Sequence, residues 1–264
     1  MTRTSRASLI CFAIGMSGLG ILTLVYGKFV EVWQPVAAWV PGRTGLIYAS
    51  GIVMLLSGIG LLLRRTAALS VRILLPYLII GFLLHVPALV TAPLVEVNWE
   101  SAGELGLLLG AGWVLFATRS GLGAGSQLAF ATGENGIRIG RILFGAALLP
   151  IGLSHIVYLK YTAAMVPAWL PFRTGWVYLT AAGHTAAGIG VLFSIVPRLA
   201  AAMEAGMLGV FTLLVWAPRI VAGPVTLETW SEFFSSWAMA AAAWVVADGL
   251  RTKDRASAQL LTPP

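Results

Sequence analysis

Long apolar runs separated by short charged segments dominate the chain. A helix needs roughly 20 residues to cross a bilayer. Five stretches approach or exceed that length without any Asp, Glu, Lys or Arg: 7–27, 44–63, 73–95, 142–159 and 174–197. Three shorter runs, 105–118, 205–218 and 233–247, reach it if Glu104, Arg219 and Glu232 occupy terminal turns. The pattern therefore predicts eight membrane-spanning helices.

The predicted spans are helices and not strands. The chain has no segments in which apolar and polar residues alternate, as they do in the strands of a membrane barrel. Runs rich in Ala, Leu and Gly satisfy their backbone groups in a membrane only as helices. With 58% hydrophobic and 10% charged residues, the composition agrees. We expect an all-α, polytopic membrane protein.

The chain also contains an internal repeat. The string AWVPGRTG at 38–45 returns as AWLPFRTG at 168–175, and Trp99 and Trp113 match Trp230 and Trp244 at nearly the same offset. A steady offset across four predicted helices indicates a duplication. Four spans are an even number, so both copies enter the membrane in the same direction. We expect two parallel four-helix bundles: a first repeat at 1–118, a cytoplasmic linker at 119–137, a second repeat at 138–250 and a cytoplasmic tail at 251–264.

The basic residues indicate the orientation. Of the 17 Lys and Arg residues, twelve fall on the side of the two termini and five on the opposite side. The positive-inside rule then places both termini in the cytoplasm. Because these residues are scattered at helix ends, nucleic acid is not an expected partner. The expected partner is the lipid bilayer, and the oligomeric state is left open.

Two histidines in the second repeat are the candidates for chemistry, because ionisable groups inside a membrane are costly and usually functional. They are His155 and His184, whose counterparts in the first repeat are Thr23 and Met54. We expect them to exchange protons. At 1.5 Å per residue, their depths differ by about 8 to 9 Å, which argues against a shared metal or haem, so no metal site is expected. Cys11 is a single cysteine and forms no intramolecular disulfide.

Other polar and aromatic residues of the second repeat are expected to form a ligand-binding site around these histidines. They are Tyr158, Trp169, Arg173, Arg219, Glu228 and Glu232. Arg173, like Arg43, places a cation in a first helical turn, where it opposes the helix dipole. Its partner is lipid phosphate, a nearby Glu or a ligand headgroup. The alternative for the whole set is a group of hydrogen bonds between helices. Prolines 87, 93, 218 and 224 predict breaks in the third and seventh spans.

The second repeat also resembles a known family. The segments GLSHIVY (152–158), VPAWLP (166–171) and WVYLTAAGHTAAG (176–188) are similar to those of DoxX and DoxX-like bacterial membrane proteins. The resemblance implies a four-helix unit, here doubled, in the bacterial cytoplasmic membrane. It also implies a link to thiosulfate:quinone oxidoreductase subunits, with quinone as the candidate cofactor and redox proteins as partners. No built-in cofactor is expected.

Three classes of function follow, and whether the protein is an enzyme is left open. The first is a membrane subunit of a quinone-linked oxidoreductase system, with a pocket for a small molecule or quinone headgroup in the second bundle. The alternative is a noncatalytic scaffold that holds a lipid or a partner. A small-solute transporter comes third, because no predicted span carries a buried acid at mid-membrane.

Overall fold

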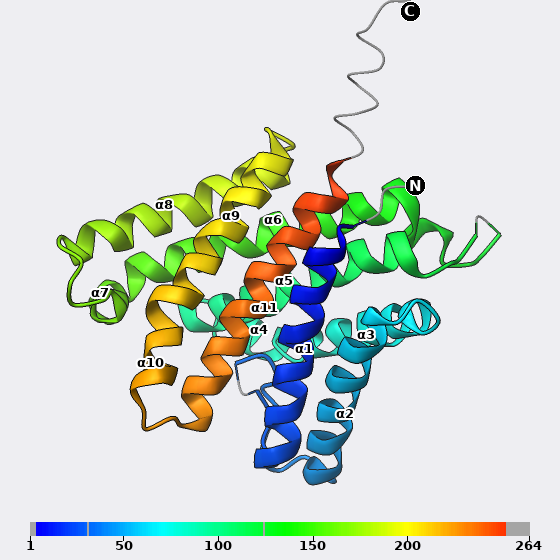
Figure 1. The fold of residues 1–264 in the computed structure, drawn as a ribbon, viewed down its shortest axis with the longest axis horizontal. Coiled ribbons are helices and arrows are strands. Elements are labelled where there is room, and N and C mark those ends of the chain that lie inside the picture. The colour runs from blue at the N-terminus through cyan, green and yellow to red at the C-terminus, as the bar shows by residue number, and fades with distance from the viewer. Residues whose placement is uncertain (1–3, 31, 124, 252–264) are drawn as a thin grey trace, which may run out of the picture.

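The computed structural model describes residues 4–30, 32–123 and 125–251, and within these ranges the chain is helical and forms no strand. The expected all-α class is confirmed (Figure 1). The helices are α1 (Arg6–Tyr26), α2 (Arg43–Leu62), α3 (Ala67–Leu83), α4 (Val86–Thr91), α5 (Glu96–Arg119), α6 (Gly133–Val157), α7 (Leu159–Met165), α8 (Arg173–Leu192), α9 (Pro197–Phe211), α10 (Ala217–Ala222) and α11 (Leu227–Gly249), with a 3-10 turn η1 (Ala129–Ala131) and a π-helical segment η2 (Thr212–Trp216). Of the predicted cytoplasmic tail, residues 252–264 lie outside the described ranges.

Within the described residues, six helical segments are long and apolar enough to cross a membrane. They are Arg6–Tyr26, Arg43–Leu62, Ala67–Thr91, Glu96–Arg119, Gly133–Val157 and Pro197–Ala222. The sequence predicted eight spans. The other two predicted spans correspond to α8 and α11, which have 20 and 23 residues and are not among these six.

Two helices extend beyond the charge-free windows of the sequence. The helix α9 begins at Pro197, so Glu204 lies inside it and not before it. The helix α6 begins at Gly133, so the connection after α5 is shorter than the predicted linker at 119–137. A charged residue ends a charge-free window without ending a helix, which explains both differences. The predicted proline breaks are present, since Pro87 and Pro218 lie in the first turns of α4 and α10.

The same close contact joins the first two helices of each half. In α1, a Cβ atom on Gly20 would lie 2.8 Å from the carbonyl oxygen of Gly51 in α2. In α6, a Cβ atom on Gly152 would lie 3.0 Å from the carbonyl oxygen of Ala181 in α8. Glycine therefore lets both helix pairs approach at backbone distance.

The two halves are joined by contacts between the first helix of one and the last helix of the other. The helix α1 packs along α11, α6 packs along α5, and α5 and α11 also touch. Gly15 of α1 lies against Ala238 of α11, and Gly110 of α5 lies against Gly140 of α6. The halves share one buried core, and the pairs α1–α2 and α6–α8 diverge from it (Figure 1).

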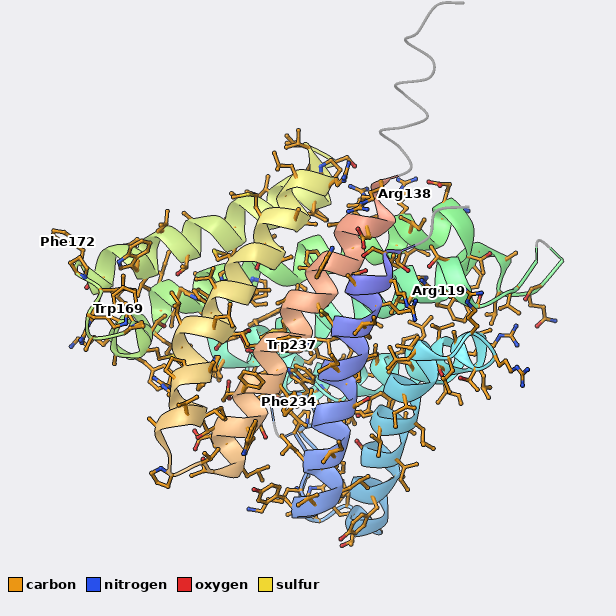
Figure 2. All side chains as sticks on the ribbon, viewed as in Figure 1. Arg119, Arg138, Trp169, Phe172, Phe234 and Trp237 are labelled. Carbon is orange, nitrogen blue, oxygen red and sulfur yellow. The ribbon has the colours of Figure 1, made fainter. Side chains whose placement is uncertain are left out.

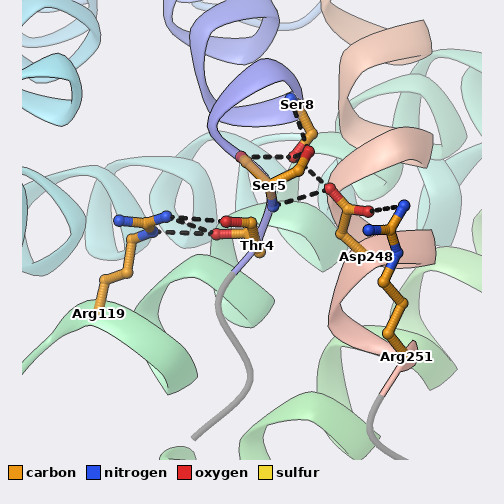
Figure 3. Close-up of polar contacts among 6 residues, drawn as sticks. All are labelled: Thr4, Ser5, Ser8, Arg119, Asp248 and Arg251. Atoms are coloured by element: carbon orange, nitrogen blue, oxygen red, sulfur yellow. Dashed lines mark hydrogen bonds and ion pairs between the residues drawn. The ribbon is translucent and has the colours of Figure 1, made fainter.

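Both ends of the described chain meet at one face of the molecule. Asp248, near the end of α11, is 1% exposed. Its carboxylate accepts hydrogen bonds from the backbone N–H of Ser5 at 2.9 Å and the hydroxyl of Ser8 at 2.7 Å, and it pairs with Arg251 at 3.0 Å (Figure 3). Ser5 is also the N-cap of α1. The buried carboxylate therefore fixes the start of α1 to the end of α11.

A second contact fixes the same end of α1 to α5. The guanidinium of Arg119 donates hydrogen bonds to the hydroxyl of Thr4 at 2.9 and 3.0 Å (Figure 3). The first residues of the described chain thus contact the last helix of each half.

Replacing Asp248 with Ala is expected to lower the free energy of unfolding by about 1–3 kcal/mol, because two buried donors lose their acceptor. Arg251→Ala is the matched control and removes only the half-exposed partner, at a cost of about 0–1 kcal/mol. Thermal unfolding in detergent measures both. Equal losses in the two variants would contradict a role for the buried hydrogen bonds.

Replacing Gly110 with Ala is expected to destabilise the protein by about 1–3 kcal/mol through overpacking between α5 and α6. The new methyl group would lie 2.8 Å from the carbonyl oxygen of Gly140. Gly209→Ala is the control, because no atom lies within 4 Å of its added Cβ. That variant is expected to gain about 0.5–1 kcal/mol from helix propensity. Thermal unfolding measures the stability of both variants. If Gly110→Ala is as stable as Gly209→Ala, the close contact between α5 and α6 is refuted.

Candidate functional site

The second half borders a half-open cavity of about 1090 Å³. Its walls come from α6, α7, α8, α9, α10 and α11, and also from α5 of the first half. Apolar side chains such as Met203, Met207 and Leu214 line most of it, and polar groups gather on part of the wall. Small-molecule sites typically have volumes of about 300–1,000 Å³ and a mostly apolar lining with a few polar groups. The cavity lies slightly above that range.

The structure brings six of the eight predicted site residues to this cavity. They are His155, Tyr158, His184, Arg219, Glu228 and Glu232. These residues come from four helices, with Tyr158 just after the end of one of them, so packing and not sequence proximity assembles them. Tyr158, which follows α6, is held in place by the backbone N–H of Val97, which donates to its hydroxyl at 3.1 Å.

The other two predicted residues, Trp169 and Arg173, lie outside the cavity. Trp169 is 70% exposed, and Figure 2 shows it with Phe172 at the tip of the connection into α8. Arg173 is exposed as the first residue of α8. Neither residue lines the cavity, although Leu170 before the helix and Trp176 in its first turn do. The prediction that these two residues contact a ligand there is not met.

Arg43 is the corresponding arginine of the first half, and the sequence predicts an anionic partner for it. In the structure, nearby uncharged groups contact it instead. The guanidinium of Arg43 donates to the carbonyl oxygen of Val36 at 3.3 Å and lies 5.2 Å from the ring centre of Phe29. A carbonyl dipole and an aromatic face thus stabilise this cation.

A buried pair that the sequence analysis missed lies at the wall of the cavity. His184 Nδ1 is 2.7 Å from Glu204 Oε1, and the two side chains are 1% and 0% exposed. Glu204 was overlooked because it stood outside the charge-free window of the seventh span. The sequence does contain a signal that could have indicated Glu204: an acid in an apolar helix needs a partner. The expectation that no span carries a buried acid was therefore wrong.

The second histidine lies beside the first. The ring centres of His155 and His184 are 4.8 Å apart, and Phe211 lies about 6 Å from both. His155 Nδ1 also lies 2.9 Å from the carbonyl oxygen of Ile151. The predicted offset of about 8 to 9 Å was wrong. The helix α6 ends two residues after His155, whereas α8 extends eleven residues outward from His184, so the two helix ends lie at different depths.

Two atoms of the buried pair have no hydrogen-bond partner. They are His184 Nε2 and Glu204 Oε2, both inaccessible to solvent. Buried polar atoms are nearly always satisfied, so an orphan beside a cavity indicates capacity for a ligand or an ordered water. The described residues contain no group of three or more His, Cys, Asp and Glu side chains that could hold a metal.

Two further carboxylates reach the cavity from the first half. Glu100 and Glu104 of α5 line it together with the acids of α11, and they interact electrostatically with Glu232. Glu104 also accepts a hydrogen bond from Trp33 Nε1 at 3.1 Å. The sequence analysis assigned Glu104 to a terminal helical turn. Only the packing of α5 against α6 brings it to the site.

A much smaller space lies in the described part of the first half. The space near Trp33 and Gln34 has a volume of only about 10 Å³, and both side chains are buried. Gln34 donates to the hydroxyls of Ser50, at 2.6 Å, and Tyr77. This buried segment fills the first half, whereas the corresponding connection of the second half forms α7 and leaves the space open.

The comparisons with known proteins point to the same half. A family model described as a domain of unknown function (DUF8561) matches residues 144–247. No curated protein and no solved structure matches the chain. The matched segment contains both histidines, Glu204 and most of the cavity wall. The similarity carries no activity, because the family itself has no known function.

Replacing Glu204 with Leu is expected to lower the free energy of unfolding by about 1–3 kcal/mol, because His184 Nδ1 loses its only partner in a buried position. The double variant His184→Met, Glu204→Leu is expected to regain most of that loss, since both polar groups are then removed. Methionine is chosen because Met54 occupies the corresponding position of the first half. Thermal unfolding of the wild type, both single variants and the double variant measures the coupling, and additive losses would refute the pair.

Proposed function

We propose that the chain is a multi-pass membrane protein that binds a small amphipathic molecule in the cavity of its second half. The decisive observation is an apolar cavity lined in part by His184, whose buried Nε2 has no hydrogen-bond partner among the described residues. The apolar lining suits an apolar body. The carboxylates and histidines mainly accept hydrogen bonds, so the ligand headgroup is a hydrogen-bond donor.

The proposal includes the finer topology predicted from the sequence. We propose that α8 and α11 also cross the membrane, because 20 and 23 residues at 1.5 Å per residue cover about 30 Å or more. Eight spans then form two parallel repeats. Support comes from the equivalent contacts at Gly20 and Gly152.

The presence of Arg119 and Arg251 at the face where the chain ends meet supports cytoplasmic termini. The bacterial cytoplasmic membrane remains part of the proposal through the resemblance to DoxX proteins.

A quinol is the neutral ligand that fits this description, and it keeps the proposed link to quinone-linked oxidoreductases. Its hydroxyl groups would donate to acceptors such as His184 Nε2. His155, beside it, is placed to accept a proton from the headgroup. Electrons released by the quinol would pass to a partner redox protein. A scaffold that holds only a partner protein needs no cavity of this size, so ligand binding is the better explanation.

Proton-coupled transport is the second candidate, favoured by one observation. The sequence pattern ranks transport third, because no predicted span carries a buried acid at mid-membrane. Glu204, which is buried within α9, removes that objection. The helix α9 also changes to the π-helical segment η2 beside the cavity, and π-helical segments are frequent at functional sites. Uptake of a solute by proteoliposomes that depends on Glu204 would move this candidate to first place.

The binding proposal is tested with decylubiquinol as the probe. Decylubiquinol is expected to raise the melting temperature of the purified protein, and both His155→Ala and a cavity-filling variant, Gly206→Trp, should abolish that rise. Gly206 lines the cavity, and no atom lies within 4 Å of its added Cβ.

Arg173→Ala serves as the control, because Arg173 lies outside the cavity, and it should retain the full rise. A rise that persists in Gly206→Trp would show that the quinol binds elsewhere. If decylubiquinol has no effect on the wild-type protein, the quinol assignment fails.

A further inference from the structure

We propose that the cavity selects a positively charged headgroup, so that its preferred ligand is an amphipathic amine: a primary ammonium group on an apolar body. The inference rests on the proposed function, since it takes the cavity to be a ligand site. It adds the charge of the ligand, which neither the sequence analysis nor the matching family assigns.

The charges around the cavity carry the first step. Four carboxylates line it, from Glu100, Glu104, Glu228 and Glu232, against a single guanidinium, that of Arg219. Arg219 lies 4.8 Å from the ring centre of Trp216 and interacts electrostatically with Glu232. Glu204 lies behind the wall and already has His184 as its partner. The described lining therefore carries an excess of acids.

The positions of these acids make the excess costly. Glu104 interacts electrostatically with both Glu232 and Glu100, and Glu232 also interacts with Glu228. Like charges repel more strongly near apolar walls than in water, because the local dielectric constant is lower. A cation placed among them replaces this repulsion with attraction. An anion would meet only Arg219 and would add to the repulsion.

The inner wall gives an independent indication of a donor. His184 is 1% exposed and lines the cavity. When its Nδ1–H donates to Glu204, Nε2 presents a lone pair that no group of the protein satisfies. An ammonium group has three N–H donors and no acceptor, and ionised carboxylates only accept. An ammonium group therefore matches both the outer acids and the inner nitrogen.

Aromatic rings complete the match. Phe211 and Trp216 line the cavity near the histidines and near Arg219. The face of an aromatic ring attracts a cation. Trp216 already has a cation near its ring, since Arg219 lies beside it. The remaining wall consists largely of methionine, leucine and valine side chains, which suit the apolar body of the ligand.

The test compares three ligands that share one alkyl chain and differ only in the headgroup: decylamine, decanol and decanoate. The protein is held in nanodiscs of uncharged phosphatidylcholine at neutral pH, and dissociation constants come from calorimetry. The wild-type protein is expected to bind decylamine at least about tenfold more tightly than decanol, with decanoate the weakest. A tenfold change corresponds to the order of magnitude of one charge-assisted contact.

Isosteric variants separate charge from shape. Glu100→Gln and Glu232→Gln should each weaken decylamine binding by about tenfold and leave decanol binding unchanged. Glu134→Gln is the matched control, because it removes the same charge from an exposed residue at the start of α6, away from the cavity. It should bind decylamine like the wild type. Circular dichroism and melting temperatures confirm that each variant is folded.

The outcomes distinguish this inference from the proposed function. If decylubiquinol binds in the cavity and decylamine shows no preference over decanol, the charge selection is overturned and the ligand site stands. Equal binding of decylamine by the wild type and Gly206→Trp would place the amine outside the cavity and also overturn the inference. If neither probe binds the wild-type protein, the proposed function and the inference both fail.

Discussion

Backbone-distance packing between the first helix of one half and the last helix of the other is the constraint on which this structure depends. Gly110 and Gly140 bring α5 and α6 together, and Gly15 brings α1 against α11. Helices in a membrane gain little from the hydrophobic effect between them, so close packing of small residues must hold them. Larger residues at these positions would separate the halves.

The packing of α5, from the first half, against α6 and α11 of the second half also builds the candidate site. The cavity belongs mainly to the second half, yet α5 of the first half supplies Glu100 and Glu104 to its wall. A second half that folded as an isolated bundle would lack these acids. The two halves therefore differ: Trp33 and Gln34 are buried within the first half, while its last helix completes the wall of the candidate site in the other half.

The buried pair of His184 and Glu204 shows how an apolar helix tolerates an acid. Each side chain is almost fully removed from solvent, and a hydrogen bond of 2.7 Å joins them. Removing one partner of such a pair leaves the other uncompensated, so the two residues act as a unit. Their free atoms, Nε2 and Oε2, stay unsatisfied by protein groups. Those unsatisfied atoms and the acidic lining are the observations from which we propose a ligand that donates hydrogen bonds.

Much of the architecture is determined by the sequence alone. Apolar length predicts the helices, and the histidines direct attention to the second half. Only the tertiary structure decided which groups meet. The depth of His155 relative to His184 depends on where two helices end, and the partner of Glu204 lies twenty residues away on another helix. The sequence determines which chemical groups are present. Helix packing determines the distances between them, and the chemistry of a site depends on those distances.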